Sequence, residues 1–347
     1  MISIHTCEFT LETNYKNFNF LLSCAYKKAK GQHRLGPSTK YKSQNVKVDE
    51  VLDSKGITIE YHNYEYRKMI KIITNPSKLL GGNDLKIWEP NIYNTERFLD
   101  LLNEHISEYF DYNYDINDFK LTRIDFTANL EVGKKKVPEY ISLMHKLGKV
   151  KGFSSKYNKS DYASGRSNKK TSFDLKGKTN NIEFTIYDKE ADLIEQNKFK
   201  LAEKAKGILR IEIRLTKRPA IKNALANYTR NISLTSEEEF TLLALNCQQT
   251  FFEWFVKVIP CGNFYTLKEA EKLIFKHELK KSKREKMFRL INLIPVKKSL
   301  YLAAKELNVR NLDELLRCFA DINVSPITIS KHKKITFLPN LYNYFQL

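Results

Sequence analysis

Arg123-Ile-Asp-Phe-Thr127 is nearly repeated at Arg210-Ile-Glu-Ile-Arg214, and these two stretches decide the predicted fold. In both, apolar and polar residues alternate, which is the pattern of a half-buried strand. Because successive side chains of a strand point to opposite faces, Asp125 and Glu212 lie on the polar face, beside arginines. The sequence therefore predicts two strands that each aim an acid flanked by arginine out of a sheet.

A third alternating stretch, Glu183-Phe-Thr-Ile-Tyr-Asp-Lys189, lies between the first two. Its alternation places Glu183, Tyr187 and Lys189 on one face. A phenol has a pKa of about 10, so its attack on a phosphodiester at neutral pH requires a base, a cation or a metal ion. Lys189 could lower that pKa or balance charge in the transition state. Tyr187 is the candidate nucleophile, with Lys189 as its catalytic partner, although a strand tyrosine is far more often a core residue.

The acids of these strands are candidate ligands of a divalent cation. Mg²⁺ and Mn²⁺ prefer carboxylate oxygens and water, and either ion would polarise a scissile phosphate. The predicted ligands are Asp125, Glu212 and, with less support, Glu183. The flanking arginines would then bind phosphates of DNA: Arg123, Arg210 and Arg214. The alternative is that each acid only forms ion pairs with arginines on neighbouring strands.

The charge of the chain predicts a polyanionic partner. The 347 residues include 59 Lys and Arg against 40 Asp and Glu, a formal net charge of +19. Nucleic acid is the polyanion that most often matches such an excess. No apolar run approaches the roughly 20 residues that a membrane span requires, and the N-terminus lacks the pattern of a signal peptide. We expect a cytoplasmic protein in a bacterial host that binds DNA and no membrane.

The order of predicted elements indicates an α+β fold. A strand–strand–helix–strand unit occurs at 57–130 and again at 171–216, and both copies end on Arg-Ile-acid. Duplication of one antiparallel unit, with helices packed on its sheet, would place Asp125 and Glu212 in equivalent positions about a pseudo-twofold axis. Helical patterns dominate after about residue 230. We therefore expect a catalytic domain over 1–228 and an α-helical DNA-binding or accessory domain over 229–347.

Capping signals give the ends of several predicted helices. Thr95 is the expected N-cap of a helix over 95–110, and Ser236 with Glu239 forms an expected capping box. A single helix is predicted over 189–205, ending at Gly207.

Two basic segments are candidate DNA contacts. A predicted helix that begins near Thr266 carries a row of cations at a spacing of four residues: Lys268, Lys272, Lys276, Lys280 and Arg284. This row suits duplex phosphates, although it could also be a solvated face. Residues 149–181 interleave lysines with aromatic residues, which suits either single-stranded DNA or a solvated loop.

Four segments, in this order, resemble the replication initiators of filamentous phages, the gene II proteins, and more distantly the plasmid initiators that lack the paired metal-binding histidines. Asn75-Pro-Ser-Lys-Leu-Leu-Gly-Gly-Asn-Asp84 is similar to a Pro-Ala-Lys-Val-Leu-Gln-Gly segment of that family. Thr122-Arg-Ile-Asp125 is similar to its Ser-Arg-Ile-Asp strand. Tyr187-Asp-Lys189 resembles its Tyr-x-Lys, and Arg210-Ile-Glu-Ile-Arg214 its Arg-Phe-Glu-Ala-Arg strand.

The resemblance implies an enzyme that nicks and rejoins one DNA strand at an origin to start rolling-circle replication. In that interpretation Tyr187 forms a 5′-phosphotyrosine and frees a 3′-OH for the host polymerase, working with the host helicase. Asp125 and Glu212 carry over as metal-ligand candidates. The substrate would be origin DNA, single-stranded or supercoiled. The rival interpretation is a non-catalytic, sequence-specific DNA-binding protein, either a repressor or an initiator that melts an origin without cutting it.

Overall fold

The computed structural model describes residues 1–28, 36–38, 43–148, 150–155, 171–179, 181–230 and 233–345. The chain divides into two compact units whose segments alternate along the sequence. Unit A comprises Ile2–Ala128 and Arg214–Phe251, and unit B comprises Met1, Asn129–Ile213 and Phe252–Leu347. The division falls inside strands β6 (Lys120–Glu131) and β10 (Ile208–Leu215) and inside helix α10 (Cys247–Val258). A domain boundary at 228/229 stays a prediction from the sequence.

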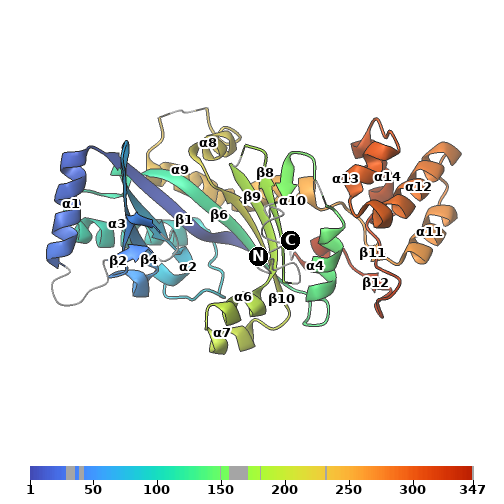
Figure 1. Cartoon of the computed structure of the whole chain (residues 1–347), viewed down its shortest axis with the longest axis horizontal. Coiled ribbons are helices and arrows are strands. Elements are labelled where there is room, and N and C mark those ends of the chain that lie inside the picture. The colour runs from blue at the N-terminus through green and yellow to red at the C-terminus, as the bar shows by residue number, and fades with distance from the viewer. Residues whose placement is uncertain are drawn as a thin grey trace. The chain divides into compact units, whose positions relative to one another are not determined.

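Unit A is built on an antiparallel sheet with the strand order β2-β3-β4-β5-β1-β6 (Figure 1). Besides β6, its strands are β1 (Ile2–Thr13), β2 (Gly36–Ser38), β3 (Ser43–Asp49), β4 (Ile57–Tyr64) and β5 (Arg67–Thr74). Its helices are α1 (Tyr15–Lys28), α2 (Pro76–Leu79), α3 (Ile92–Tyr109), α8 (Arg218–Leu225) and α9 (Ser236–Leu245), with 3₁₀ turns at Asp53–Lys55 and Ile116–Asp118. The predicted hairpin over 57–74 is confirmed as β4 and β5.

The core of unit A joins β1 to helices α3 and α9. The ring of Phe240 on α9 lies 4.8 Å from that of Phe98 on α3 and 6.4 Å from that of Phe9 on β1, measured between centroids. All three side chains are fully buried. Burial of one such side chain stabilises the fold by about 1.5–3 kcal/mol, so this contact fixes both helices on the sheet.

Helix α9 begins one residue earlier than its predicted capping box. Thr235 Oγ1 accepts a hydrogen bond from the Glu238 amide at 3.2 Å, and Glu238 Oε2 accepts one from the Thr235 amide at 2.8 Å. The prediction of Ser236 with Glu239 was wrong because two adjacent hydroxyl residues precede a run of three glutamates. Glu239 is buried instead and forms a two-bonded ion pair with Arg218 of α8.

We expect Arg218→Ala to lower the free energy of unfolding by about 2–3 kcal/mol, because it leaves the Glu239 carboxylate buried without its counter-ion. The loss falls short of that for a fully buried pair since the Arg218 side chain is 29% exposed. Urea unfolding of the full chain measures it. Arg67→Ala is the matched control, because its partner Glu12 is 60% exposed and such pairs contribute at most about 1 kcal/mol. Equal losses in the two variants would contradict the prediction.

Unit B contains a second antiparallel arrangement of strands, in the order β10-β9-β8-β7 (Figure 1). Besides β10, these strands are β7 (Phe153–Ser155), β8 (Ser172–Gly177) and β9 (Ile182–Asp188). The helices beside them are α4 (Val137–His145), α6 (Lys189–Glu195) and α7 (Phe199–Lys204). The predicted hairpin over 171–188 is confirmed as β8 and β9. Residues 156–170 of the predicted basic segment lie outside the described residues.

The C-terminal part of unit B is helical. Its elements are α11 (Leu267–Lys276), α12 (Lys281–Lys297), α13 (Leu300–Glu306) and α14 (Leu312–Asp321), with a short pair of strands, β11 (Phe264–Tyr265) and β12 (Phe337–Leu338), and a 3₁₀ turn at Leu341–Tyr344. Helix α12 packs against α11, α13 and α14. The α+β fold class is therefore confirmed. Across the described ranges, no helix combines the length and apolarity needed to cross a bilayer.

The predicted duplication holds for the order of elements but not for strand pairing. Strands β8, β9 and β10 are neighbours in sequence order, whereas β1 pairs between β5 and β6. Asp125 therefore lies beside Thr6 of β1, with a register shift in β1 between Ile4 and Thr6. The pseudo-twofold relation between Asp125 and Glu212 stays a prediction.

Two predicted helices differ from those observed. The helix predicted over 189–205 is two helices, because Asn197 adopts a left-handed conformation with φ of 59° between α6 and α7. Helix α3 begins after Asn91, whose side chain accepts a hydrogen bond from the Asn94 amide at 2.8 Å. The prediction of Thr95 as N-cap was wrong, because Thr95 lies inside the helix and is fully buried.

Candidate active site

Tyr187 lies near the end of β9, on the face that it shares with residues of β8 and β10. In the antiparallel register of β8 and β9, Tyr187 is opposite Ser172 and Thr185 is opposite Asp174, so these four side chains share one face. From β10, Glu212 reaches the same place: the Tyr187 hydroxyl donates a hydrogen bond to Glu212 Oε1 at 2.6 Å. Glu212 is only 1% exposed. The structure thus brings together the predicted nucleophile and one predicted acid.

Two cations lie close to this tyrosine–glutamate pair. Arg210, on the same strand as Glu212, is fully buried and donates through Nε to Asn129 Oδ1 at 2.7 Å. Lys189 Nζ lies 5.7 Å from the centroid of the Tyr187 ring and donates to Asp192 Oδ2 at 2.6 Å. Lys189 was predicted on the strand face, but β9 ends at Asp188 and Lys189 is the first residue of α6. It reaches the ring from the helix, because Asp188 caps that helix.

The surroundings of Tyr187 keep its hydroxyl protonated. Burial raises its pKa well above the ordinary value of 10, and the negative charge of Glu212 raises it further, while Arg210 opposes both effects. Burial also lowers the pKa of Lys189, and the charge of Arg210 adds to this lowering. Tyr187 is therefore a neutral phenol at physiological pH, and its deprotonation has to accompany any attack. Glu212 is the group in position to accept that proton.

Asp125, in unit A, forms a different arrangement. Arg123 donates to both of its carboxylate oxygens, through Nε to Oδ1 at 2.8 Å and through Nη2 to Oδ2 at 2.5 Å. Arg214 Nε lies 3.6 Å from Oδ2. Asp125 is 1% exposed, and its charge raises the pKa of Arg123. The predicted alternation gave the correct face, but the acids of β6 and β10 are buried and do not project into solvent.

A preformed divalent-cation site does not fit this geometry. Two arginines already compensate the charge of Asp125, and Glu212 accepts the Tyr187 hydroxyl. Glu183 lies four residues before Tyr187 on β9, about 13 Å along the strand. Within the part of the chain that the structure describes, no three His, Cys, Asp or Glu side chains gather as metal ligands would. Mg²⁺ or Mn²⁺ on Asp125, Glu212 and Glu183 therefore stays a prediction from the sequence.

Three polar residues of this region were missed from the sequence. Asp174 is buried on β8 and accepts a hydrogen bond from Ser172 Oγ at 2.7 Å. Asp192 balances Lys189, and Asn129 binds Arg210. The hairpin register contained the signal for Asp174, because the pairing of β8 with β9 places it opposite Thr185. Nothing in the strand pattern pointed to Asp192, which lies one helical turn into α6.

The predicted row of cations is not one helix face. Lys268, Lys272 and Lys276 lie on α11, which ends before Lys280 and Arg284 at the start of α12. Lys272 pairs with Glu269 at 2.7 Å. Arg284 donates to the carbonyls of His277 and Leu279 at 3.2 and 3.3 Å, so it holds the connection between the helices. The prediction of one continuous helix face was wrong, since the spacing was counted through a helix break. Contact of these residues with DNA stays a prediction from the sequence.

Comparison with known proteins gives one family. The matching model describes the N-terminal part of the replication-associated gene II protein of phages, and it covers residues 21–239. The matched range contains β6, β9 and β10, with Asp125, Tyr187 and Glu212. Comparison with curated proteins gave no match.

Proposed function

The chain belongs to the gene II family of phage replication-associated proteins, and from that premise we propose that it nicks and rejoins one strand of origin DNA through Tyr187. Family membership makes it a replication protein that acts on DNA. The observation that carries the finer proposal is the 2.6 Å hydrogen bond from the Tyr187 hydroxyl to the buried Glu212 carboxylate. This hydrogen bond places a candidate nucleophile in direct contact with a candidate base, which is the arrangement that activates a hydroxyl.

The proposed step begins with the Tyr187 oxygen attacking the scissile phosphorus while Glu212 takes the phenol proton. The bond between phosphorus and the 3′-oxygen breaks, and that oxygen takes a proton from water to become a 3′-OH. The 5′-phosphate stays on the tyrosine as an ester. The host polymerase and helicase would then extend from the 3′-OH, and attack by a later 3′-OH on the phosphotyrosine would rejoin the strand and release the enzyme.

Charge stabilisation in this step is assigned to residues around the pair. The buried Arg210 guanidinium stabilises negative charge on the tyrosine oxygen, since its positive charge favours the ionised phenol. Lys189 lies against the Tyr187 ring and is balanced by Asp192. Arg123 and Arg214, which both pair with Asp125, are proposed as phosphate contacts on the sequence pattern alone. A divalent cation, if bound, would polarise the phosphate, and no step here depends on it.

The experiment uses purified full-length protein with single-stranded and supercoiled DNA of its own replicon, with Mg²⁺ or Mn²⁺ and with EDTA. Denaturing gels detect a covalent protein–DNA adduct. We expect an adduct at the 5′ side of a single nick. Specific binding without any adduct under every condition would overturn the nicking function. It would leave the rival, a non-catalytic repressor or origin-melting protein.

The substitution Asp125→Asn tests whether Asp125 serves as an ion-pair partner of the arginines or as a metal ligand. We expect the variant to lose about 2 kcal/mol of stability, because Arg123 and Arg214 lose their buried counter-ion while about a quarter of each arginine side chain stays exposed to solvent. We expect the same loss with and without Mn²⁺, measured by thermal unfolding. Mn²⁺ that stabilises the unaltered chain but not Asp125→Asn would instead make Asp125 a metal ligand.

A further inference from the structure

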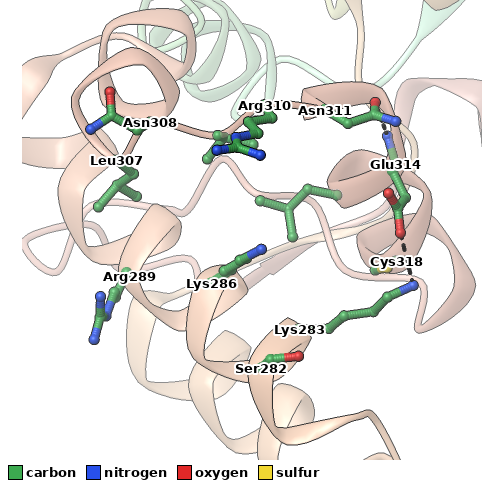
Figure 2. A pocket seen from close by; sticks show the side chains of 12 residues that line it. Ser282, Lys283, Lys286, Arg289, Leu307, Asn308, Arg310, Asn311, Glu314 and Cys318 are labelled. Atoms are coloured by element: carbon green, nitrogen blue, oxygen red, sulfur yellow. Dashed lines mark hydrogen bonds and ion pairs between the residues drawn. The ribbon is translucent and has the colours of Figure 1, made fainter.

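A cavity of about 490 Å³ lies among the C-terminal helices, between α12 and the turn Leu307–Asn311 that joins α13 to α14. Lys283, Lys286 and Arg289 line it from α12, and Arg310 lines it from the turn. Figure 2 shows these α12 side chains on one side of the hollow and Arg310 with Asn308 and Asn311 on the other. Cations therefore flank the cavity on two sides.

Of these four cations, Lys283 has an acidic partner. Lys283 pairs with Glu314 at 3.1 Å, and Glu314 also belongs to the lining of the cavity. Among the described residues, Lys286, Arg289 and Arg310 form no ion pair within 4.0 Å, and all three are exposed. Glu314 is paired with Lys283, so the like charges of the other three cations repel one another, and an anion held between them would be favoured. The cavity thus has the charge of a phosphate site.

The spacing of the cations on α12 matches several phosphates. Lys283, Lys286 and Arg289 recur every three residues, which places them along about 9 Å of the helix. Consecutive phosphates of one strand of duplex DNA are about 3.4 Å apart along the axis, and those of an extended single strand are further apart. On either measure the row is long enough to reach more than one phosphate of a strand, and it exceeds the size of a single inorganic anion.

A second hollow borders the same turn. It has a volume of about 450 Å³ and shares Val309, Arg310 and Asn311 with the cationic cavity. Its lining includes Tyr301 together with Lys151, Lys257 and one acid, Asp313. Aromatic surface beside cations is the combination that accommodates unpaired bases next to their phosphates. Duplex DNA would present no base face to Tyr301, so the second hollow favours a single strand.

We infer that these two hollows form one groove that binds single-stranded DNA, with Lys286, Arg289 and Arg310 on the phosphates and Tyr301 on the bases. Most residues of the groove lie beyond 21–239, the range that the family model matches. The exceptions are Leu147, Val150 and Lys151 of the second hollow. It rests on the proposed function only in taking DNA as substrate. Its role is to hold the strand, apart from the chemistry at Tyr187, so the two can fail separately.

The test measures binding of a labelled single-stranded oligonucleotide by fluorescence anisotropy, with full-length protein carrying Tyr187→Phe to prevent cleavage. We expect Lys286→Gln with Arg289→Gln to weaken binding about tenfold at moderate salt. The slope of log K against log salt should become shallower by about 1.4, since each lost phosphate contact on a single strand removes about 0.7. Tyr301→Ala should weaken binding to the single strand while leaving the salt slope unchanged.

The matched control is Lys200→Gln with Lys204→Gln, which removes the same charge from exposed positions of α7 that are not candidate DNA contacts. Equal losses in both double variants would overturn the groove and leave a general electrostatic attraction. A loss as large with duplex as with single strand would make the surface a duplex contact and overturn the single-strand assignment. Displacement of the oligonucleotide by a deoxynucleoside triphosphate at equal phosphate concentration would indicate a mononucleotide site instead. Adduct formation by protein with intact Tyr187, at saturating DNA, should survive Lys286→Gln with Arg289→Gln.

Discussion

Tyr187→Phe is expected to abolish the covalent protein–DNA adduct and to lower the rate of strand cleavage by about 10³-fold or more, the scale seen when an enzyme loses its nucleophile. The substitution removes one oxygen and keeps the ring against Lys189. It also removes the hydroxyl that donates to the buried Glu212 carboxylate, which costs about 1.5–3 kcal/mol of stability and leaves the fold intact. Affinity for origin DNA should therefore stay close to that of the unaltered chain. Denaturing gels of end-labelled DNA measure the adduct, and anisotropy measures binding.

Tyr66→Phe is the control for this experiment, because Tyr66 lies in the turn between β4 and β5 and is 93% exposed. It should leave both adduct and cleavage unchanged. Cleavage that persists in Tyr187→Phe with an adduct would move the nucleophile to another tyrosine. Cleavage that persists without any adduct would replace the phosphotyrosine mechanism by hydrolysis. Either result would leave membership of the family untouched.

The sequence was sufficient to predict the strands of this site and the face on which its residues lie. Alternation in β6, β9 and β10 identifies which side chains share a face, because this period belongs to the single strand. Alternation does not predict how deeply that face is buried. Asp125 and Glu212 were expected on exposed faces, yet both are buried. What covers a face depends on elements distant in sequence, and no pattern within one strand contains that information.

The neighbours of each residue on adjacent strands could not be predicted from the sequence either. The N-terminal strand β1 pairs between β5 and β6, so the neighbours of Asp125 differ from those expected from a simple duplication. The bond between Tyr187 and Glu212 depends on the position of β10 beside β9. Lys189 illustrates a third limit, since the alternating pattern ran one residue past the end of β9 into α6.

The basic C-terminal helices show how counting can mislead. Five cations at a spacing of four residues suggested one face, but the break between α11 and α12 separates them. The cations that converge in space are Lys286, Arg289 and Arg310, from a helix and a turn that the spacing did not connect. Helical packing, rather than a linear period, brings them to one cavity.

Glu212→Gln is expected to lower the rate of adduct formation about 10²–10⁴-fold at neutral pH, the usual contribution of a positioned general base. Glutamine keeps the size of the side chain and can still contact the Tyr187 hydroxyl, but it cannot take the proton. Single-turnover adduct formation measures the rate. Asp174→Asn is the matched control on the same face, since Asp174 is hydrogen-bonded to Ser172 rather than to the nucleophile. A comparable loss in Asp174→Asn would show that any acid removed from this face disturbs the site.

The pH dependence of the Glu212→Gln variant distinguishes a base from a structural residue. Burial raises the pKa of Tyr187 above 10, and this cause remains when Glu212 is replaced by a neutral side chain, although the contribution of the Glu212 charge is lost. Below that pKa the phenolate fraction rises tenfold for each pH unit, so the variant should form adduct about tenfold faster per unit between pH 7 and about pH 10. With Glu212 intact the proton leaves during attack, and the rate should rise much less steeply over the same range. Parallel profiles would contradict the role of Glu212 as base, because a residue that only holds Tyr187 in place lowers the rate equally at every pH.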